Sequence, residues 1–128
     1  MFLNNVLNVN IQPAEEIKKN LKKEAEFRLQ RAQRGYADAD LWNFETYLAN
    51  VLCEGLEQFR QSTCCYPTET MKEWEQTLLD MQDGFCYYVE HRDDMPSIED
   101  YQAHQDEVNK RLKKSLKLLR KHFQSLWW

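Results

Sequence analysis

The sequence predicts an all-α protein, a compact bundle of about four helices with a short irregular N-terminal arm. Only three glycines and three prolines occur in 128 residues, so turn signals are few and the helices are expected to be long. Good helix formers such as Leu, Glu, Lys, Gln and Arg are abundant. Four stretches also show helical apolar periodicity. The length is that of one domain, which we assign to residues 1–128.

Residues 1–12 are expected to form the arm, because apolar residues alternate with asparagine there and no helical period is visible. The arm either packs on its own domain or reaches a neighbouring subunit. A helix is predicted over 13–34, since Pro13 suits a first helical position and Gly35 suits a C-terminal end. Its apolar stripe consists of Ile17, Leu21, Ala25, Leu29 and Ala32.

The second predicted helix, 38–61, has the most regular apolar pattern of the chain and is therefore placed at the centre of the core. Asp38 or Asp40 is expected to cap its N-terminus. Tyr36 and Trp42 add an aromatic cluster at the same end. Its apolar face consists of Leu41, Phe44, Leu48, Val51, Leu52, Leu56 and Phe59.

A third helix is predicted over 71–90, where Thr70 and Glu73 have the spacing of a capping box. Gly84 lies inside this helix, where glycine costs about 1 kcal/mol relative to alanine. A close crossing with another helix would explain the glycine without any ligand.

The fourth helix is predicted over 97–126, as one helix or as two pieces with a bend. Ser97 and Asp100 resemble another capping start. Leu118 and Trp128 project away from the apolar stripe and are candidates for exposed apolar contacts. The stripe consists of Ile98, Tyr101, Val108, Leu112, Leu116, Leu119, Phe123 and Leu126.

Charge is unevenly distributed along the chain. Residues 1–34 carry seven basic and four acidic residues, residues 35–109 three basic and 17 acidic, and residues 110–128 seven basic and no acidic residue. Basic outer helices beside acidic inner helices explain this pattern, and a basic patch for an acidic partner is the alternative. The net charge of −4 argues against general nucleic-acid binding.

Four cysteines occur without an N-terminal secretion signal: Cys53, Cys64, Cys65 and Cys86. Reduced thiols in a cytoplasmic setting are therefore expected, and no stretch is apolar enough for a membrane span. Adjacent cysteines are a poor chelating pair, so a zinc site is not expected. No nucleophile signature and no glycine-rich phosphate loop is present, and no cofactor is predicted.

Paired carboxylates are the best signal for an enzyme. Glu54-x-x-Glu57 and Asp80-x-x-Asp83 resemble the E-x-x-E and E-x-x-D motifs of all-α nucleoside-triphosphate pyrophosphohydrolases, which hold magnesium between helices. Asp80 stands where that family has glutamate. The helical wheel also turns all four carboxylates away from the apolar faces. A magnesium-dependent hydrolase is therefore kept as the alternative. We do not expect the protein to be an enzyme.

Three further segments resemble a widespread group of small helical proteins encoded by bacteriophages and prophages. They are 34–42 (RGYADADLW), the Trp74 helix that ends near Gly84 and Phe85, and the tail 118–128 (LLRKHFQSLWW). The group has a G-[YW]-x-D-x-[DE]-x-W segment and an F-x-S-L-W tail, and the resemblance covers most of residues 34–128. It implies a phage context in the host cytoplasm and assigns no catalytic residue.

The resemblance favours a phage accessory protein that binds a host or defence component, either a protein surface or a sequestered small signal ligand. A homo-oligomer is expected. A structural virion or scaffold part is a further alternative, and membrane-surface or nucleic-acid binding by the basic C-terminal helix is less favoured. The two ends of the resemblance are expected to pack together as the binding surface. Its candidate residues are Tyr36, Asp38, Asp40, Trp42, Phe123, Trp127 and Trp128.

Overall fold

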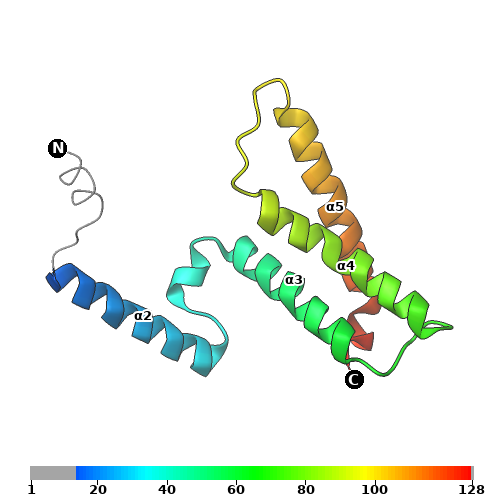
Figure 1. Cartoon of the computed structure of the whole chain (residues 1–128), viewed down its shortest axis with the longest axis horizontal. Helices are drawn as coiled ribbons and strands as arrows, with labels where there is room; N and C mark the ends of the chain where they lie inside the picture. Colours follow the sequence, from blue (N-terminus) through cyan, green and yellow to red (C-terminus); the bar gives the residue numbers. More distant parts are fainter. Residues whose placement is uncertain (1–13, 128) are drawn as a thin grey trace, which may run out of the picture. The chain divides into compact units, whose positions relative to one another are not determined.

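The computed structural model describes residues 14–127, which contain α-helices and 3₁₀ turns but no strand (Figure 1). The all-α prediction is therefore confirmed. The predictions for the arm 1–12 and for Trp128 fall outside the described residues. The elements are α2 (Ala14–Arg34), η1 (Asp38–Leu41), α3 (Phe44–Ser62), α4 (Met71–His91), α5 (Tyr101–His122) and η2 (Phe123–Ser125), where η denotes a 3₁₀ turn.

The chain divides into two units, one that ends at Trp42 and one that begins at Asn43, and each is described by itself. The single domain 1–128 stays a prediction. In the first unit, α2 ends as predicted at Gly35, whose φ of 86° is accessible to glycine at little cost. The Gly35 N–H donates to the Arg31 carbonyl at 2.9 Å. No residue of α2 is buried.

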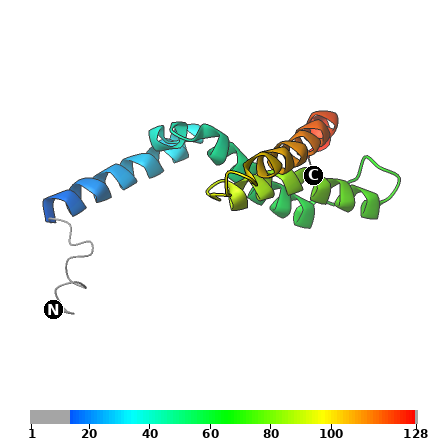
Figure 2. The ribbon, with the colours of Figure 1, turned by 90° about the horizontal axis from the view of Figure 1, so that it is seen from above.

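In the second unit, α4 lies against both α3 and α5, as the two ribbon views show (Figures 1 and 2). The buried core cluster takes one residue from α3 and four from α4. The central helix is therefore α4, and the prediction that the 38–61 segment is central was wrong. A helix with neighbours on two sides buries more of its surface than a helix with one. The cluster consists of Leu56, Trp74, Leu78, Met81 and Phe85.

The predicted helix 38–61 is interrupted. Its first four residues form η1, and α3 begins only at Phe44 because Asn43 has non-helical dihedrals, φ −133° and ψ 63°. Ala37 precedes η1, and its N–H donates to Asp40 Oδ2 at 2.8 Å. Asp40 thus reaches back to the start of a 3₁₀ turn and does not begin a long α-helix.

The two predicted capping sites have different outcomes. Thr70 Oγ1 accepts a hydrogen bond from the Glu73 N–H at 3.1 Å, which confirms the cap of α4. Ser97 Oγ accepts from the Asp100 N–H at 3.3 Å, but this bond closes a turn, and α5 begins at Tyr101. The same type of hydrogen bond therefore caps a helix at Thr70 but only closes a turn before the helix at Ser97.

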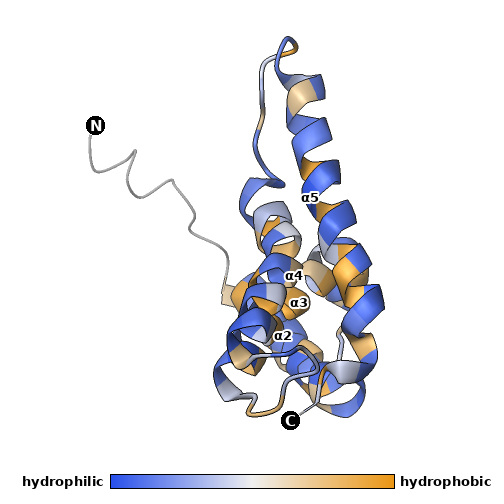
Figure 3. Ribbon diagram, turned by 90° about the vertical axis from the view of Figure 1, so that its right-hand side faces the viewer, coloured by the Kyte–Doolittle hydropathy of each residue, from blue (hydrophilic) through white to orange (hydrophobic). Residues whose placement is uncertain are grey.

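Helix α5 is apolar along one side and hydrophilic along the other (Figure 3). Leu118 packs against the core cluster together with Leu112 and Leu119, so the prediction that Leu118 projects away was wrong. Leu116, which was assigned to the stripe, is 52% exposed. At the end of α5, the His122 ring meets the edge of buried Trp74, with 5.4 Å between the ring centroids.

Cys53 of α3 and Cys86 of α4 form a disulfide, with an S–S distance of 2.08 Å. The expectation of reduced thiols is therefore wrong for this pair. Sequence spacing gave no sign of it, because the two cysteines are 33 residues apart and meet only when the helices pack. Cys64 and Cys65 are free and exposed.

Candidate functional site

An open apolar groove lies on the second unit where α3, α4 and α5 come together. Its cavity has a volume of about 300 Å³. Leucines of α3 and α5 supply its walls, and Phe85 and Tyr88 of α4 also line it. Such a concave apolar site with few polar groups is the usual form of a binding site. The lining residues are Glu45, Leu48, Ala49, Leu52, Phe85, Tyr88, Leu112 and Leu116.

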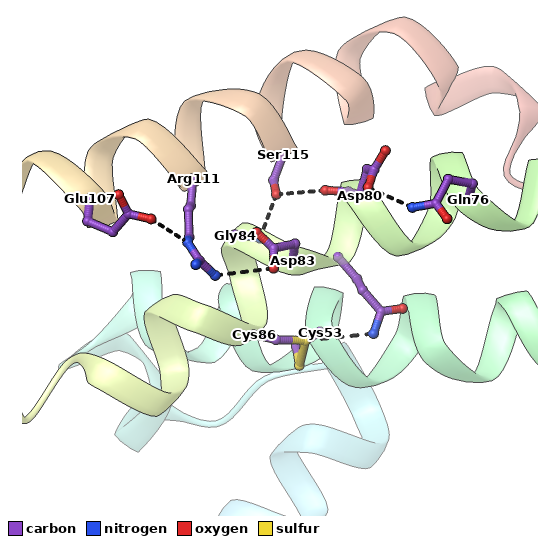
Figure 4. A network of polar contacts seen from close by, with 10 residues as sticks. Cys53, Gln76, Asp80, Asp83, Gly84, Cys86, Glu107, Arg111 and Ser115 are labelled. Carbon is purple, nitrogen blue, oxygen red and sulfur yellow. Dashed lines mark hydrogen bonds and ion pairs between the residues drawn. A yellow bond between two sulfur atoms is a disulfide. The ribbon is translucent and has the colours of Figure 1, made fainter.

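The groove depends on a tight crossing of α4 and α5. The Gly84 N–H donates to Ser115 Oγ at 2.7 Å, and Ser115 Oγ lies 3.4 Å from the Asp80 carbonyl (Figure 4). A Cβ on Gly84 would lie 2.5 Å from Ser115 Oγ and 2.6 Å from the Arg111 carbonyl carbon. The close crossing predicted from Gly84 is confirmed, and it fixes α5 as one wall of the groove.

Arg111 holds the same two helices together at the surface. Its guanidinium donates to Glu107 at 2.8 Å and to Asp83 of α4 at 3.3 Å (Figure 4). It also lies 4.1 Å from the centroid of the Tyr87 ring, a cation–π contact. The hydrogen bond from Arg111 lowers the pKa of Glu107. Through its contacts with Asp83 and Tyr87, Arg111 of α5 is therefore bound to α4 close to Gly84.

The polar end of the groove is a hydrogen bond from Tyr88 to Glu45 Oε1 at 3.4 Å. Burial raises the pKa of the Tyr88 hydroxyl, and the nearby Glu45 charge adds to the effect. Tyr88 therefore stays a neutral donor at physiological pH. Among the described residues, no lysine or arginine lines the groove. The site can thus accept an apolar surface with a basic edge, but it offers no cation for an anionic ligand.

The four carboxylates of the hydrolase alternative do not form a ready metal site. Asp80 accepts from Gln76 at 3.0 Å, and Asp83 pairs with Arg111. Hydrogen bonds from Gln61 and from other neighbours, among them Arg60, lower the pKa of Glu57. Glu54 is exposed. Across residues 14–127, no group of three or more His, Cys, Asp or Glu residues is placed to hold a metal ion.

Asp38 and Asp40, two candidate residues of the predicted binding surface, both make hydrogen bonds within the first unit. Asp38 accepts from Arg34 at 2.5 Å and from Gln30 at 2.9 Å, and these bonds lower its pKa. Arg31 makes a bidentate pair with Asp40 at 2.8 and 3.0 Å. Together with the backbone N–H described above, this pair lowers the pKa of Asp40. Both carboxylates therefore hold η1 against α2 and have few acceptor positions left for a ligand.

The aromatic candidates are more accessible. The Arg34 guanidinium covers the Tyr36 ring at 4.4 Å from its centroid, whereas Trp42 is 88% exposed. In the second unit, Phe123 is 67% and Trp127 is 64% exposed. The head and tail residues belong to different units, so a combined surface stays a prediction.

Sequence reasoning missed the groove because it assigned the groove residues to the core. Leu48 is 44% exposed, and Leu116 is also half exposed, although both lie on regular apolar stripes. A usable signal was present: two long stripes, in 38–61 and 97–126, offer more apolar surface than the single helix between them can cover. Excess apolar surface of this kind marks a groove or an interface.

Within residues 14–127, no helix combines the length and the apolar composition that a membrane span requires. Comparison of the chain with protein-family models, with curated proteins and with solved structures gave no match.

Proposed function

We propose that this chain is a non-covalent binding protein of a phage or prophage, which acts on a host or defence protein through the groove between α3, α4 and α5. The observation that carries the proposal is the open apolar cavity of about 300 Å³, which leucines of α3 and α5 line. Helical scaffolds with such a groove accept the apolar face of an amphipathic helix. The proposed partner element is therefore a helix with an apolar stripe.

The lining of the groove favours a protein partner over a sequestered signal molecule. Nucleotide-type signals carry phosphates, which proteins hold with arginine, lysine or helix N-termini. No basic side chain of the described residues lines this cavity. Its one charged residue, Glu45, instead favours a basic residue at the edge of the partner's apolar stripe.

Self-association is part of the proposal. α2 exposes the large side chains of its apolar stripe, with Leu21 60% and Leu29 57% exposed, and none of its residues is buried. In proteins most of the stability of a helix comes from packing of its amphipathic face, so α2 gains stability when a partner covers its stripe. Native mass spectrometry over a range of concentrations would report the expected homo-oligomer, and a monomer at every concentration would contradict it.

The setting that we propose is the host cytoplasm, and the disulfide makes this testable. Cytoplasmic reductants keep most thiols reduced, whereas Cys53 and Cys86 are bonded here. Rapid alkylation of the protein inside host cells, followed by mass spectrometry, would show whether this pair is protected. A fully alkylated pair is the result expected in the cytoplasm, and a pair that stays bonded and protected would contradict this setting.

The groove is tested by placing a charge on its walls. Leu48→Lys and Leu116→Lys each put an ammonium where a partner's apolar side chain would lie, while Ile98→Lys changes an apolar residue that is 97% exposed outside the groove. A lost leucine contact is worth about 1.5–3 kcal/mol, so each groove variant should bind at least about tenfold more weakly.

The partner is first captured from host cells with the wild-type protein, and the purified partner is then titrated against all three variants. Circular dichroism checks that each variant remains helical. The proposal requires normal binding by Ile98→Lys and weak binding by both groove variants. Equal binding by all three proteins would mean that the partner, if any, uses another surface.

A further inference from the structure

Two thiols lie side by side in the loop that joins α3 to α4. Cys64 and Cys65 are adjacent in sequence, and both are exposed. Their Sγ atoms are 3.9 Å apart, close enough for a hydrogen bond between the sulfurs. Most adjacent residues point in different directions, so this pair is a preformed dithiol.

The backbone around the pair is held in place. The Thr63 N–H donates to the Phe59 carbonyl at 2.8 Å, and the buried Thr63 hydroxyl donates to the Cys65 carbonyl at 3.1 Å. Further along the loop, Thr68 Oγ1 donates to the Thr70 carbonyl at 2.8 Å. These bonds reduce the conformational entropy that a reaction between the two sulfurs would cost.

An aromatic cavity opens beside the dithiol. Its volume is about 250 Å³, and the loop and the C-terminal tail line it together. Trp127 lines this cavity together with Cys65 and is 64% exposed. The lining residues are Cys65, Tyr66, Pro67, Ser125 and Trp127.

We propose that Cys64 and Cys65 form a dithiol site that reduces disulfides carrying an aromatic or apolar group, and that the pair closes to a vicinal disulfide. The thiolate of one cysteine attacks one sulfur of the disulfide, forms a mixed disulfide and releases the first thiolate, which takes up a proton. The thiolate of the other cysteine then attacks the Sγ of the first and releases the second thiolate. Two protein thiols lose two hydrogens in total, and one disulfide becomes two thiols.

The hydrogen bond with Cys64 and the charge of its thiolate raise the pKa of Cys65. Ionisation of Cys65 is therefore disfavoured next to a Cys64 thiolate, so the two sulfurs react one after the other and not together.

The product should be easily reduced again. Adjacent Cα atoms are about 3.8 Å apart across a trans peptide bond, whereas common disulfides need about 4.4–6.8 Å. Departure from the common geometry makes a disulfide more reducible. The site thus responds to redox conditions independently of the disulfide between α3 and α4, and it does not rest on the proposed groove function.

The test uses the full chain with the Cys53–Cys86 disulfide intact and the aromatic disulfide dithiobisnitrobenzoate as the probe. The wild-type protein should release two aryl thiolates per chain and lose two hydrogens in mass. Peptide mapping should place the new bond between Cys64 and Cys65. Cys64→Ser and Cys65→Ser should each release at most one aryl thiolate and keep any adduct that forms.

Several results would overturn the proposal: no reaction, an adduct that persists on the wild-type protein, a disulfide between two chains, or exchange with Cys53 or Cys86. The cavity is tested with Trp127→Ala, and Phe123→Ala serves as an equally exposed control outside the cavity. Loss of an aromatic contact should lower the rate of reaction with the aromatic probe roughly two- to tenfold. The rate of reaction with oxidised glutathione should not change. Equal slowing of both probes would remove the cavity from the proposal.

Discussion

A single methyl group at Gly84 should destabilise the second unit. The N–H of Gly84 donates to Ser115 Oγ at 2.7 Å, and a Cβ there would lie 2.5 Å from the same oxygen. A backbone carbon of Arg111 would lie 2.6 Å from the new atom. A side chain can rotate away from such a contact, but the Arg111 backbone cannot, so α5 must move away from α4 at this crossing.

The expected change in the free energy of unfolding is the sum of two destabilising contributions and one stabilising contribution. Overpacking of a close contact costs about 1–3 kcal/mol. Weakening the hydrogen bond to Ser115 costs about 0.5–1.5 kcal/mol more. Alanine in place of glycine returns about 1 kcal/mol through helix propensity. The net loss for Gly84→Ala is therefore about 2 kcal/mol in the free energy of unfolding.

Gly55→Ala is the matched control. Gly55 lies inside α3, and a Cβ there would meet nothing within 4 Å. The same substitution should then stabilise the protein by about 0.5–1 kcal/mol. Urea unfolding followed by circular dichroism measures both variants, and an unchanged m-value confirms that only stability differs. If Gly84→Ala is as stable as Gly55→Ala, the tight crossing of α4 and α5 is incorrect.

Three further predictions concern the disulfide and two titrating groups. The double variant of Cys53→Ser and Cys86→Ser should lose up to about 4 kcal/mol in urea unfolding, from the closure entropy of a loop with a separation of 33 residues. Because contacts with Arg31 lower the pKa of Asp40 in the folded state, its contribution to stability is complete above the unfolded pKa of about 3.9 and is lost as pH falls through the folded value. Burial lowers the pKa of His122, so stability should fall as pH drops through about 6.5, where the unfolded chain takes up a proton first.

Each of these has its own control. The serine double variant should be insensitive to reductant, and a wild-type protein whose stability is equally insensitive would contradict the disulfide prediction. Asp40→Asn should lose less helical circular dichroism than the wild-type protein below about pH 5. His122→Phe should have a melting temperature that changes less with pH between about pH 5 and 7. An unaltered pH profile in either variant would show that its carboxylate or imidazole is not the titrating group.

The fold class and most helix ends could be predicted because they depend on local chemistry. Gly35 ends α2 through its own dihedrals, and the Thr70 hydroxyl caps α4 by accepting from the Glu73 N–H, three residues along the chain. The break at Asn43 was missed because nothing in the apolar period marks it. Likewise, Ser97 and Asp100 form the expected hydrogen bond, but the local pattern does not say whether a helix or a turn follows.

Features that depend on how helices pack could not be predicted from periodicity. Leu116 and Leu118 are two residues apart on α5, and the direction in which α5 meets α4 decided which of them is covered. The meeting of Cys53 and Cys86 depends on the α3–α4 register in the same way. The groove is only partly such a case, because periodicity shows the two long stripes but not which of their residues the packing leaves exposed.

Buried Trp74 gives the second unit an internal optical reporter. Its indole is fully enclosed and meets the His122 ring, whereas Trp42 and Trp127 face solvent. Blue-shifted emission that resists acrylamide quenching should therefore come from Trp74, and red-shifted, quencher-accessible emission from the exposed indoles. Because protonated imidazole quenches indole emission, the blue component also reports the charge of one histidine at the junction of α4 and α5. Packing and protonation at this junction can thus be followed in the native sequence without any added label.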